Sequence, residues 1–191
     1  MNSSILTTHV GSLPRSKELS ELLFAKDKKE NIDQALFNDT VKKNVDEVVK
    51  RQLDVGIDVV SDGEMSKISY ATYVKDRIKG FSGESERRAP ADLDAFPAYK
   101  TKIANSGGTP TYTRPCCTSE LEIQDTQSLK NDIKNLSDSL NSNNHSKAFM
   151  NAASPGVINV FMPNKFYKDY DTYLEKLSEV MSPEYKLITD N

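Results

Sequence analysis

Hydrophobic positions along the chain recur with two periods, which predicts strands alternating with helices. An apolar and β-branched run from Ile5 to Val10 ends at Gly11 and predicts a short buried strand that leads into a loop. Ser16 stands where a helix cap is expected. The apolar residues after it fall on one helical face: Leu19, Leu22 and Leu23.

The alternation continues toward the middle of the chain. A longer helix is predicted by apolar residues at helical spacing, and Gly56 is placed to end it. A second β-branched run, Ile57 to Glu64, follows directly, which is typical of a βαβ crossover. The helix positions are Val41, Val45, Val48, Val49 and Leu53.

The last part of the chain repeats the pattern. Residues 148–156 predict a third strand that runs into a polar loop, and a helix is predicted on each side of it. Ser182 and Pro183 predict the start of a separate helical turn. The positions that predict the two helices are Leu129, Ile133, Leu136 and Leu140, then Tyr170, Tyr173, Leu174 and Leu177.

Residues 80–118 interrupt this rhythm with Gly, Pro, Ser and charged residues. They predict a hairpin or loop excursion, with extended pieces near Tyr99 to Ile103 and Thr111 to Arg114 and a turn at residues 105–110. The remaining units predict an α/β fold, either a small open sheet or an incomplete (β/α)8 barrel. Such a barrel needs eight units and about 250 residues.

Composition narrows the function classes. The chain has 191 residues, a net charge of -3 and no basic stripe, so nucleic acid is not an expected partner. No apolar run reaches the roughly 20 residues that cross a bilayer, and a cytoplasmic location is expected. The two cysteines, Cys116 and Cys117, are adjacent and are interpreted as packing residues. With two histidines and no spaced Cys/His set, no self-sufficient metal site is expected.

Polar residues follow each predicted strand, at the end where α/β folds bind ligands. Gly11 and Ser12 can offer a backbone N–H and a hydroxyl to a carboxylate, or they form an ordinary tight turn. Glu64 can pair with an ammonium group, or it is a solvated carboxylate near a helix start. His9 can orient a ligand or serve as a hydrogen-bonded structural residue. Arg15 can bind an anion or lie on the surface.

Two of these motifs carry a family resemblance. "TTHVGSLPRS", followed by "GIDVVSDGEMSKISYATYV", resembles the catalytic domain of cobalamin-independent methionine synthase and its stand-alone relatives, including epoxyalkane:coenzyme M transferases. The similarity continues through "NAASPGVINVFMPNKFY" and covers about the first half of the family domain. It implies a TIM barrel of which residues 1–191 form a single partial domain, with about three βα units.

The resemblance also implies a function. In this family zinc binds a small thiol such as homocysteine as thiolate, which then accepts a methyl or other alkyl group, in methionine synthase from a folate donor. By the same resemblance, Gly11 and Ser12 hold the amino-acid carboxylate and Glu64 receives the ammonium group, with His9 as a further candidate. The enzyme it resembles is 5-methyltetrahydropteroyltriglutamate-homocysteine S-methyltransferase.

The zinc ligands of the family are absent from the sequence, because no His-x-Cys pair occurs and His145 is followed by Ser146. The chain is therefore expected to be a truncated form that is inactive alone, with its catalytic residues unknown. One alternative is a non-catalytic amino-acid-binding or assembly module, which self-associates or pairs with a chain that completes the barrel. An unrelated flavodoxin-like domain is a third hypothesis, which no glycine-rich phosphate loop supports.

Overall fold

Three short extended segments lie side by side and run parallel to one another. The computed structural model describes residues 5–85, 91–105 and 112–191. Thr8 pairs with Val59, and Val60 pairs with Ala148, each through a single parallel bridge. Backbone hydrogen bonds of 3.0 Å flank both bridges. The middle segment therefore lies between the other two.

The first of these segments is exposed, whereas the sequence predicted a buried strand. Ile5 is 94% exposed and Val10 is 73% exposed. Within the described part of the chain, the segment bridges only to the Val59 side. None of the residues that the structure describes forms a second layer over its apolar side chains, which is the physical reason the prediction of burial was wrong.

Helices α1 (Lys17–Asp27) and α2 (Gln34–Asp54) connect the first two segments, as predicted. The Ser16 hydroxyl accepts a hydrogen bond from the N–H of Leu19 at 3.2 Å and caps α1. Gly56 follows α2 with a φ of +82°, a left-handed conformation that glycine adopts at little cost. The predictions of the cap and of the terminating glycine are confirmed.

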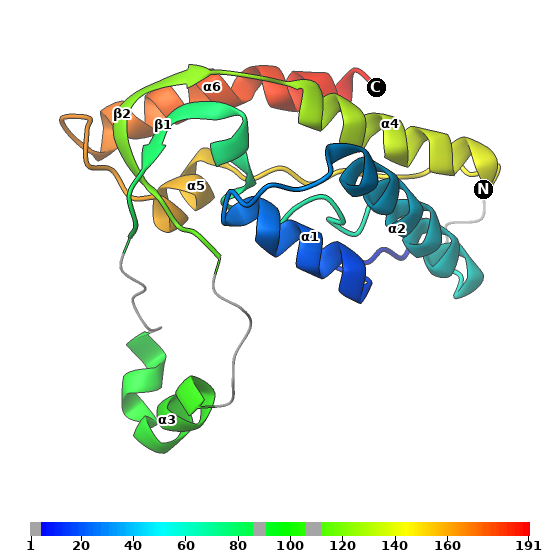
Figure 1. Ribbon diagram of the computed structural model, residues 1–191, viewed down its shortest axis with the longest axis horizontal. Helices are drawn as coiled ribbons and strands as arrows, with labels where there is room; N and C mark the ends of the chain where they lie inside the picture. The colour runs from blue at the N-terminus through cyan, green and yellow to red at the C-terminus, as the bar shows by residue number, and fades with distance from the viewer. Residues whose placement is uncertain (1–4, 86–90, 106–111) are drawn as a thin grey trace.

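An antiparallel hairpin follows the second segment. The 3-10 helix η1 (Tyr73–Asp76) leads into β1 (Ile78–Ser82), which pairs with β2 (Cys116–Ile123). Between these strands the chain forms η2 (Ala91–Ala95) and α3 (Pro97–Asn105), which Figure 1 shows apart from the rest of the molecule.

The excursion differs in detail from its prediction. The piece from Tyr99 to Ile103, predicted as extended, is part of α3, because Pro97 favours a helix start and strand pairing falls to the flanking β1 and β2. Residues 112–114 form no regular strand. Residue 111 and the predicted turn beyond residue 105 lie outside the described residues.

The last three helices are α4 (Gln127–Ser142), α5 (Pro155–Phe161) and α6 (Tyr170–Thr189). The helix predicted around Leu129 is confirmed as α4. The separate turn predicted at Ser182 is wrong, since α6 is continuous with Pro183 inside it. Its buried face extends through Met181, and Tyr185 beyond the proline donates a 2.8 Å hydrogen bond to the carbonyl of Ala153, so tertiary contacts outweigh the local proline signal.

Two hydrophobic cores hold these elements together. The first joins α1, α2 and α4 to Val60 and Met65, and the second joins the hairpin to α5 and α6 around Tyr173. In Figure 1, α6 runs along the hairpin, while α1, α2 and α4 form the other side of the molecule. None of the helices in the described part of the chain is long and apolar enough to cross a membrane.

Candidate functional site

Side chains from all three extended segments meet at Glu64. The Ser12 hydroxyl donates to Glu64 Oε2 at 2.7 Å, and Asn151 Nδ2 donates to Oε1 at 2.5 Å. Ser12 follows the first segment, Glu64 the second, and Asn151 the third. Because parallel segments end at one edge, residues far apart in the sequence are brought together here.

Burial differs sharply between the partners. Glu64 is only 3% exposed, whereas Ser12 is exposed and Asn151 is half-buried. The buried carboxylate is therefore covered by two neutral donors, one of which faces solvent. The hydrogen bonds to the carboxylate come from neutral donors, with the Arg15 guanidinium as a nearby positive charge, so the carboxylate retains the capacity to accept a hydrogen bond from a further cation.

The turn that carries Glu64 has an unusual backbone. Glu64 has a φ of +57° and Gly63 a φ of +61°, both left-handed. The N–H of Glu64 donates to Asp62 Oδ1 at 3.0 Å, and the N–H of Leu13 donates to the Gly63 carbonyl at 3.1 Å. A non-glycine residue in this region costs about 1 kcal/mol or more, so these contacts hold the turn against its local preference.

Arg15, in the loop after the first segment, binds the backbone of the same turn. One of its terminal nitrogens donates to the carbonyls of Glu64 and Lys67, both at 2.7 Å. Burial lowers the pKa of Arg15, although the carboxylates of Glu64 and Asp62 act in the opposite direction. Arg15 therefore holds the backbone, which is neither the anion-binding role nor the surface position considered for it from the sequence.

A buried cation links the turn to the third segment. Lys67 is 3% exposed, and its Nζ lies 3.8 Å from Asp62 Oδ2. The same Nζ donates to the carbonyl of Asn151 at 3.1 Å. Nothing in the sequence pattern distinguished Lys67 or Asn151 from ordinary loop residues, since their contacts span 84 and 87 positions.

Of the other predicted site residues, Gly11 lies in the exposed loop and His9 stays apart from Glu64. Gly11 is half-buried with a φ of +96°, and no atom lies within 4 Å of where a side chain would begin, so there is free space on that side of its Cα. His9 makes no hydrogen bond to Ser12 or Glu64. Its Nε2 is buried and has no hydrogen-bond partner among the described residues.

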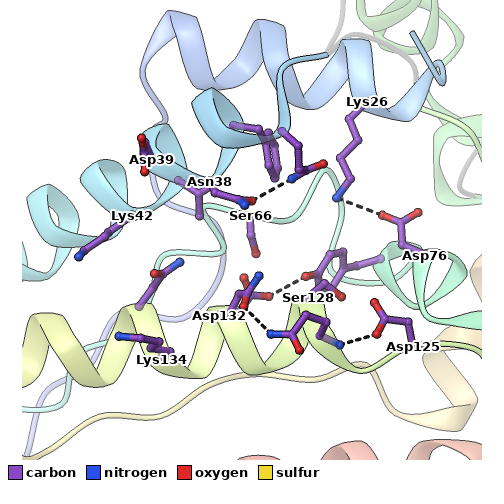
Figure 2. A pocket seen from close by; sticks show the side chains of 17 residues that line it. Lys26, Asn38, Asp39, Lys42, Ser66, Asp76, Asp125, Ser128, Asp132 and Lys134 are labelled. Atoms are coloured by element: carbon purple, nitrogen blue, oxygen red, sulfur yellow. Dashed lines mark hydrogen bonds and ion pairs between the residues drawn. The ribbon is translucent and has the colours of Figure 1, made fainter. Parts of the chain in front are cut away.

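A separate cleft of about 610 Å³ lies between α2 and α4 (Figure 2). Asp132 lies at its base and accepts a 2.7 Å hydrogen bond from the Tyr73 hydroxyl. Burial raises the pKa of both groups. Lys26, Lys42 and Lys134 also line the cleft, but Ser12 and Glu64 do not. The site predicted from the strand ends and this cleft are therefore different places.

The described residues do not suit a zinc ion. No group of three or more His, Cys, Asp or Glu side chains could hold a metal within residues 5–85, 91–105 and 112–191. Cys116 and Cys117 are both buried, and burial raises the pKa of the Cys117 thiol to about 11. His145 Nε2 lies 3.1 Å and 3.0 Å from two backbone carbonyls, which makes Nε2 a donor, so only Nδ1 of this ring has a lone pair for a metal.

Known proteins resemble the chain both in sequence and in fold. The family described as "Cobalamin-independent synthase, Catalytic domain" matches residues 5–107. The methionine synthase of Sulfolobus acidocaldarius is 26% identical over 189 residues, which cover 96% of this chain and 48% of that protein. A 5-methyltetrahydropteroyltriglutamate–homocysteine methyltransferase of Bifidobacterium longum is 31% identical over 75 residues, 39% of this chain and 10% of that protein.

Solved structures extend the likeness to the fold. A B12-independent methionine synthase from Shewanella sp. W3-18-1 matches with a TM-score of 0.67 and 17% identity, over 96% of this chain and 48% of that one. A putative vitamin-B12 independent methionine synthase from Listeria monocytogenes gives a TM-score of 0.56 with the same coverage. These structures belong to the TIM-barrel family. The chain spans about half the length of each.

Proposed function

Because the chain belongs to the cobalamin-independent methionine synthase family, we propose that it forms the amino-acid-binding part of a methyl or alkyl transferase that acts on a small thiol such as homocysteine. The observation that carries this proposal is the meeting of Ser12 and Asn151 on the Glu64 carboxylate. It gives an acidic group at the edge where the three parallel segments end, beside an open glycine loop.

The site suits the two charged groups of an amino acid. The Glu64 carboxylate receives the α-ammonium group, while the Gly11 backbone and the Ser12 hydroxyl receive the α-carboxylate. In the free protein the Ser12 hydroxyl already donates to Glu64. A bound amino acid therefore exchanges partners: its ammonium replaces Ser12 on Oε2, and the released hydroxyl turns to the ligand carboxylate. His9 stays a candidate for ligand contact through its Nε2, which has no hydrogen-bond partner in the part of the chain that the structure describes.

The proposed frame is the first part of a (β/α)8 barrel. The parallel bridges at Thr8 and at Val60, in chain order, support three consecutive βα units, with residues 80–118 as an excursion within a single partial domain. The likeness to about half of each solved TIM-barrel structure supports the same reading. The methyl donor is proposed to be a folate, since the name of the Bifidobacterium relative contains one.

Zinc chemistry is not assigned to the described residues, because they do not fit a zinc site. Cys117 is buried with a raised pKa, and no group of three or more His, Cys, Asp or Glu side chains among the described residues could hold a metal. The 191-residue chain alone is therefore proposed to bind an amino acid without turning it over. Measurable zinc-dependent methylation of homocysteine by the purified chain, with methyltetrahydropteroyl triglutamate as donor, would overturn this.

Calorimetric titration with reduced L-homocysteine and with L-methionine tests the proposal directly. The wild-type chain is expected to bind both. Glu64→Gln keeps the shape of the side chain but removes its charge, so affinity should fall about tenfold or more. Glu175→Gln, an exposed change of the same kind on α6, should leave affinity unaltered. Absence of binding at millimolar ligand, or equal affinity in Glu64→Gln, would contradict the proposed site.

A non-catalytic assembly module is the second candidate function, favoured by one observation. The first extended segment presents Ile5, Leu6 and Val10 to solvent at 94%, 49% and 73% exposure. An uncovered apolar edge of this kind is suited to a second chain, which would complete the barrel. Light scattering after size exclusion, with a hydrophobic dye, tests it: a monomer that binds little dye argues against a partner on this edge.

A further inference from the structure

The amide of Asn151 holds one oxygen of Glu64 while the other oxygen faces the exposed side of the site. Nδ2 of Asn151 donates to Oε1 at 2.5 Å, and Oε2 takes its hydrogen bond from Ser12. Asn151 is half-buried, whereas Ser12 is exposed. Of the two donors, Ser12 is therefore the one that an entering ligand can displace.

Asn151 is also fixed through its backbone. Lys67 Nζ donates to the Asn151 carbonyl at 3.1 Å and lies 3.8 Å from Asp62 Oδ2. The other oxygen of Asp62 accepts the N–H of Glu64 at 3.0 Å. These contacts close a ring that runs from Glu64 through Asn151, Lys67 and Asp62 back to Glu64. The side-chain amide and the backbone carbonyl of Asn151 thus both bond to the turn that carries Glu64.

The backbone conformation of Glu64 indicates that the ring does more than pack residues together. Its φ of +57° is unfavourable for a residue with a side chain, and such conformations persist where the surroundings determine them several times over. The ring and the hydrogen bond from Arg15 to the Glu64 carbonyl are the contacts that fix this backbone conformation. A carboxylate held in this way loses little further freedom when a ligand binds, which strengthens binding.

We propose that Asn151 is a positioning residue that fixes Glu64 so that Oε2 points at the ammonium group of a bound α-amino acid. The inference rests on the proposed function, because it assigns Glu64 to the ammonium group. When the ligand displaces Ser12, Asn151 stays on Oε1 and keeps the carboxylate aimed. The preference for a ligand with a free amino group then depends on Asn151, although Asn151 need not touch the ligand.

The test compares two ligands by ligand-observed NMR, L-methionine and 4-(methylsulfanyl)butanoate, which lacks the amino group. The wild-type chain should prefer L-methionine. In Asn151→Ala this preference should shrink about tenfold, the loss of one charge-assisted hydrogen bond. Asn151→Gln, which keeps the amide, should recover part of it, and Asn141→Ala, on the exposed end of α4, should change nothing.

Each of the other outcomes would contradict the proposed role of Asn151. If wild type binds neither ligand, the proposed function fails and the role of Asn151 fails with it. If wild type prefers L-methionine and Asn151→Ala retains that preference, or weakens both ligands equally, Asn151 is only a structural residue. Loss of the folded circular dichroism spectrum in Asn151→Ala, with no recovery in Asn151→Gln, leads to the same conclusion.

Discussion

The hydroxyl of Ser12 donates a 2.7 Å hydrogen bond to Oε2 of Glu64, across 52 residues of sequence. The two groups proposed to bind a ligand are thus bonded to each other. Ser12, the proposed donor to a ligand carboxylate, is paired with Glu64, the proposed acceptor for a ligand ammonium group. A ligand that carries only one of the two charges breaks this bond and leaves one partner unsatisfied. A zwitterion satisfies both partners.

Removal of the Ser12 hydroxyl should therefore shift two ligands in opposite directions. In Ser12→Ala, L-methionine should bind about tenfold more weakly, because its carboxylate loses a donor. The amine 3-(methylsulfanyl)propylamine should bind several-fold more tightly, since no hydrogen bond has to break before Oε2 is free. Calorimetry or NMR titration of both ligands checks this. Parallel weakening of the two ligands would count against the exchange.

A side chain at Gly63 should destabilise the turn that carries Glu64. A Cβ there would lie 2.9 Å from Met65 Cε and 3.1 Å from Leu13 Cβ, at a φ of +61°. Gly63→Ala should lower the free energy of unfolding by about 2 to 3 kcal/mol, from backbone strain and crowding together. Gly83 has a similar φ of +67° but no atom within 4 Å, so Gly83→Ala should cost only about 1 kcal/mol. Urea unfolding compares them, and equal losses would contradict the crowding.

A buried ion pair joins the hairpin to the last helix. Arg77 donates to both carboxylate oxygens of Glu184, at 2.7 to 3.0 Å, and their side chains are 3% and 11% exposed. Arg77→Met should destabilise the protein by about 3 to 5 kcal/mol, because Glu184 keeps a buried charge without a partner. The double variant Arg77→Met with Glu184→Leu should regain most of that loss. Urea unfolding of all three proteins measures it, and no recovery in the double variant would contradict the ion-pair explanation.

Stability should also depend on the ionisation of Asp27 at the end of α1. Burial alone would raise its pKa, but hydrogen bonds from Lys75 and from Thr113 outweigh burial and lower the pKa below its ordinary value. A lowered pKa in the folded state means that the stabilisation is complete above about pH 4 and is lost as the pH falls through the folded-state pKa.

Asp27→Asn should therefore melt below wild type at neutral pH and approach wild type as the pH falls below about 4. Thermal melts across this range measure the difference, with Asp54→Asn as an exposed control. A difference that stays constant with pH would show that the Asp27 contribution does not depend on its charge.

The thiols should be unreactive in the folded protein. Cys116 and Cys117 are buried, and the pKa of Cys117 is raised to about 11, mainly by burial. At pH 8 only about one Cys117 in a thousand is then thiolate, the form that reacts. Ellman's reagent should label both thiols quickly in denaturant and slowly without it. Rapid labelling of the native chain would show that the hairpin opens readily.

The features predicted well from the sequence are those that local residues determine. Ser16 caps α1 and Gly56 follows α2 because these effects act within one helical turn. The second segment was also predictable, since a β-branched run follows a long amphipathic helix there. Burial of Ile5 was not, because burial depends on a neighbouring layer that the pattern of one strand does not reveal.

Other features escaped prediction because long-range contacts decide them. Pro183 reads locally as a helix start, yet α6 passes through it to place Glu184 against Arg77 and Tyr185 against Ala153. In the candidate site, Ser12 and Glu64 could be proposed from strand-end chemistry and from the resemblance. Asn151 could not, since an asparagine in a polar loop gives no sign of the side chain that it will meet 87 positions away.

The closeness of the two ends of the excursion has a practical consequence for engineering. The N–H of Ser85 donates to the carbonyl of Arg114 at 2.7 Å, and the neighbouring Thr113 donates to Asp27 on α1, so the two ends of the excursion lie close together on the main body. The two ends of the excursion should keep their positions when the sequence between them is exchanged, because the entropic cost of closing a loop grows slowly with loop length. A fluorescent reporter or an affinity peptide could be grafted between Ser85 and Tyr112, which leaves the contacts of Thr113 with Asp27 in place.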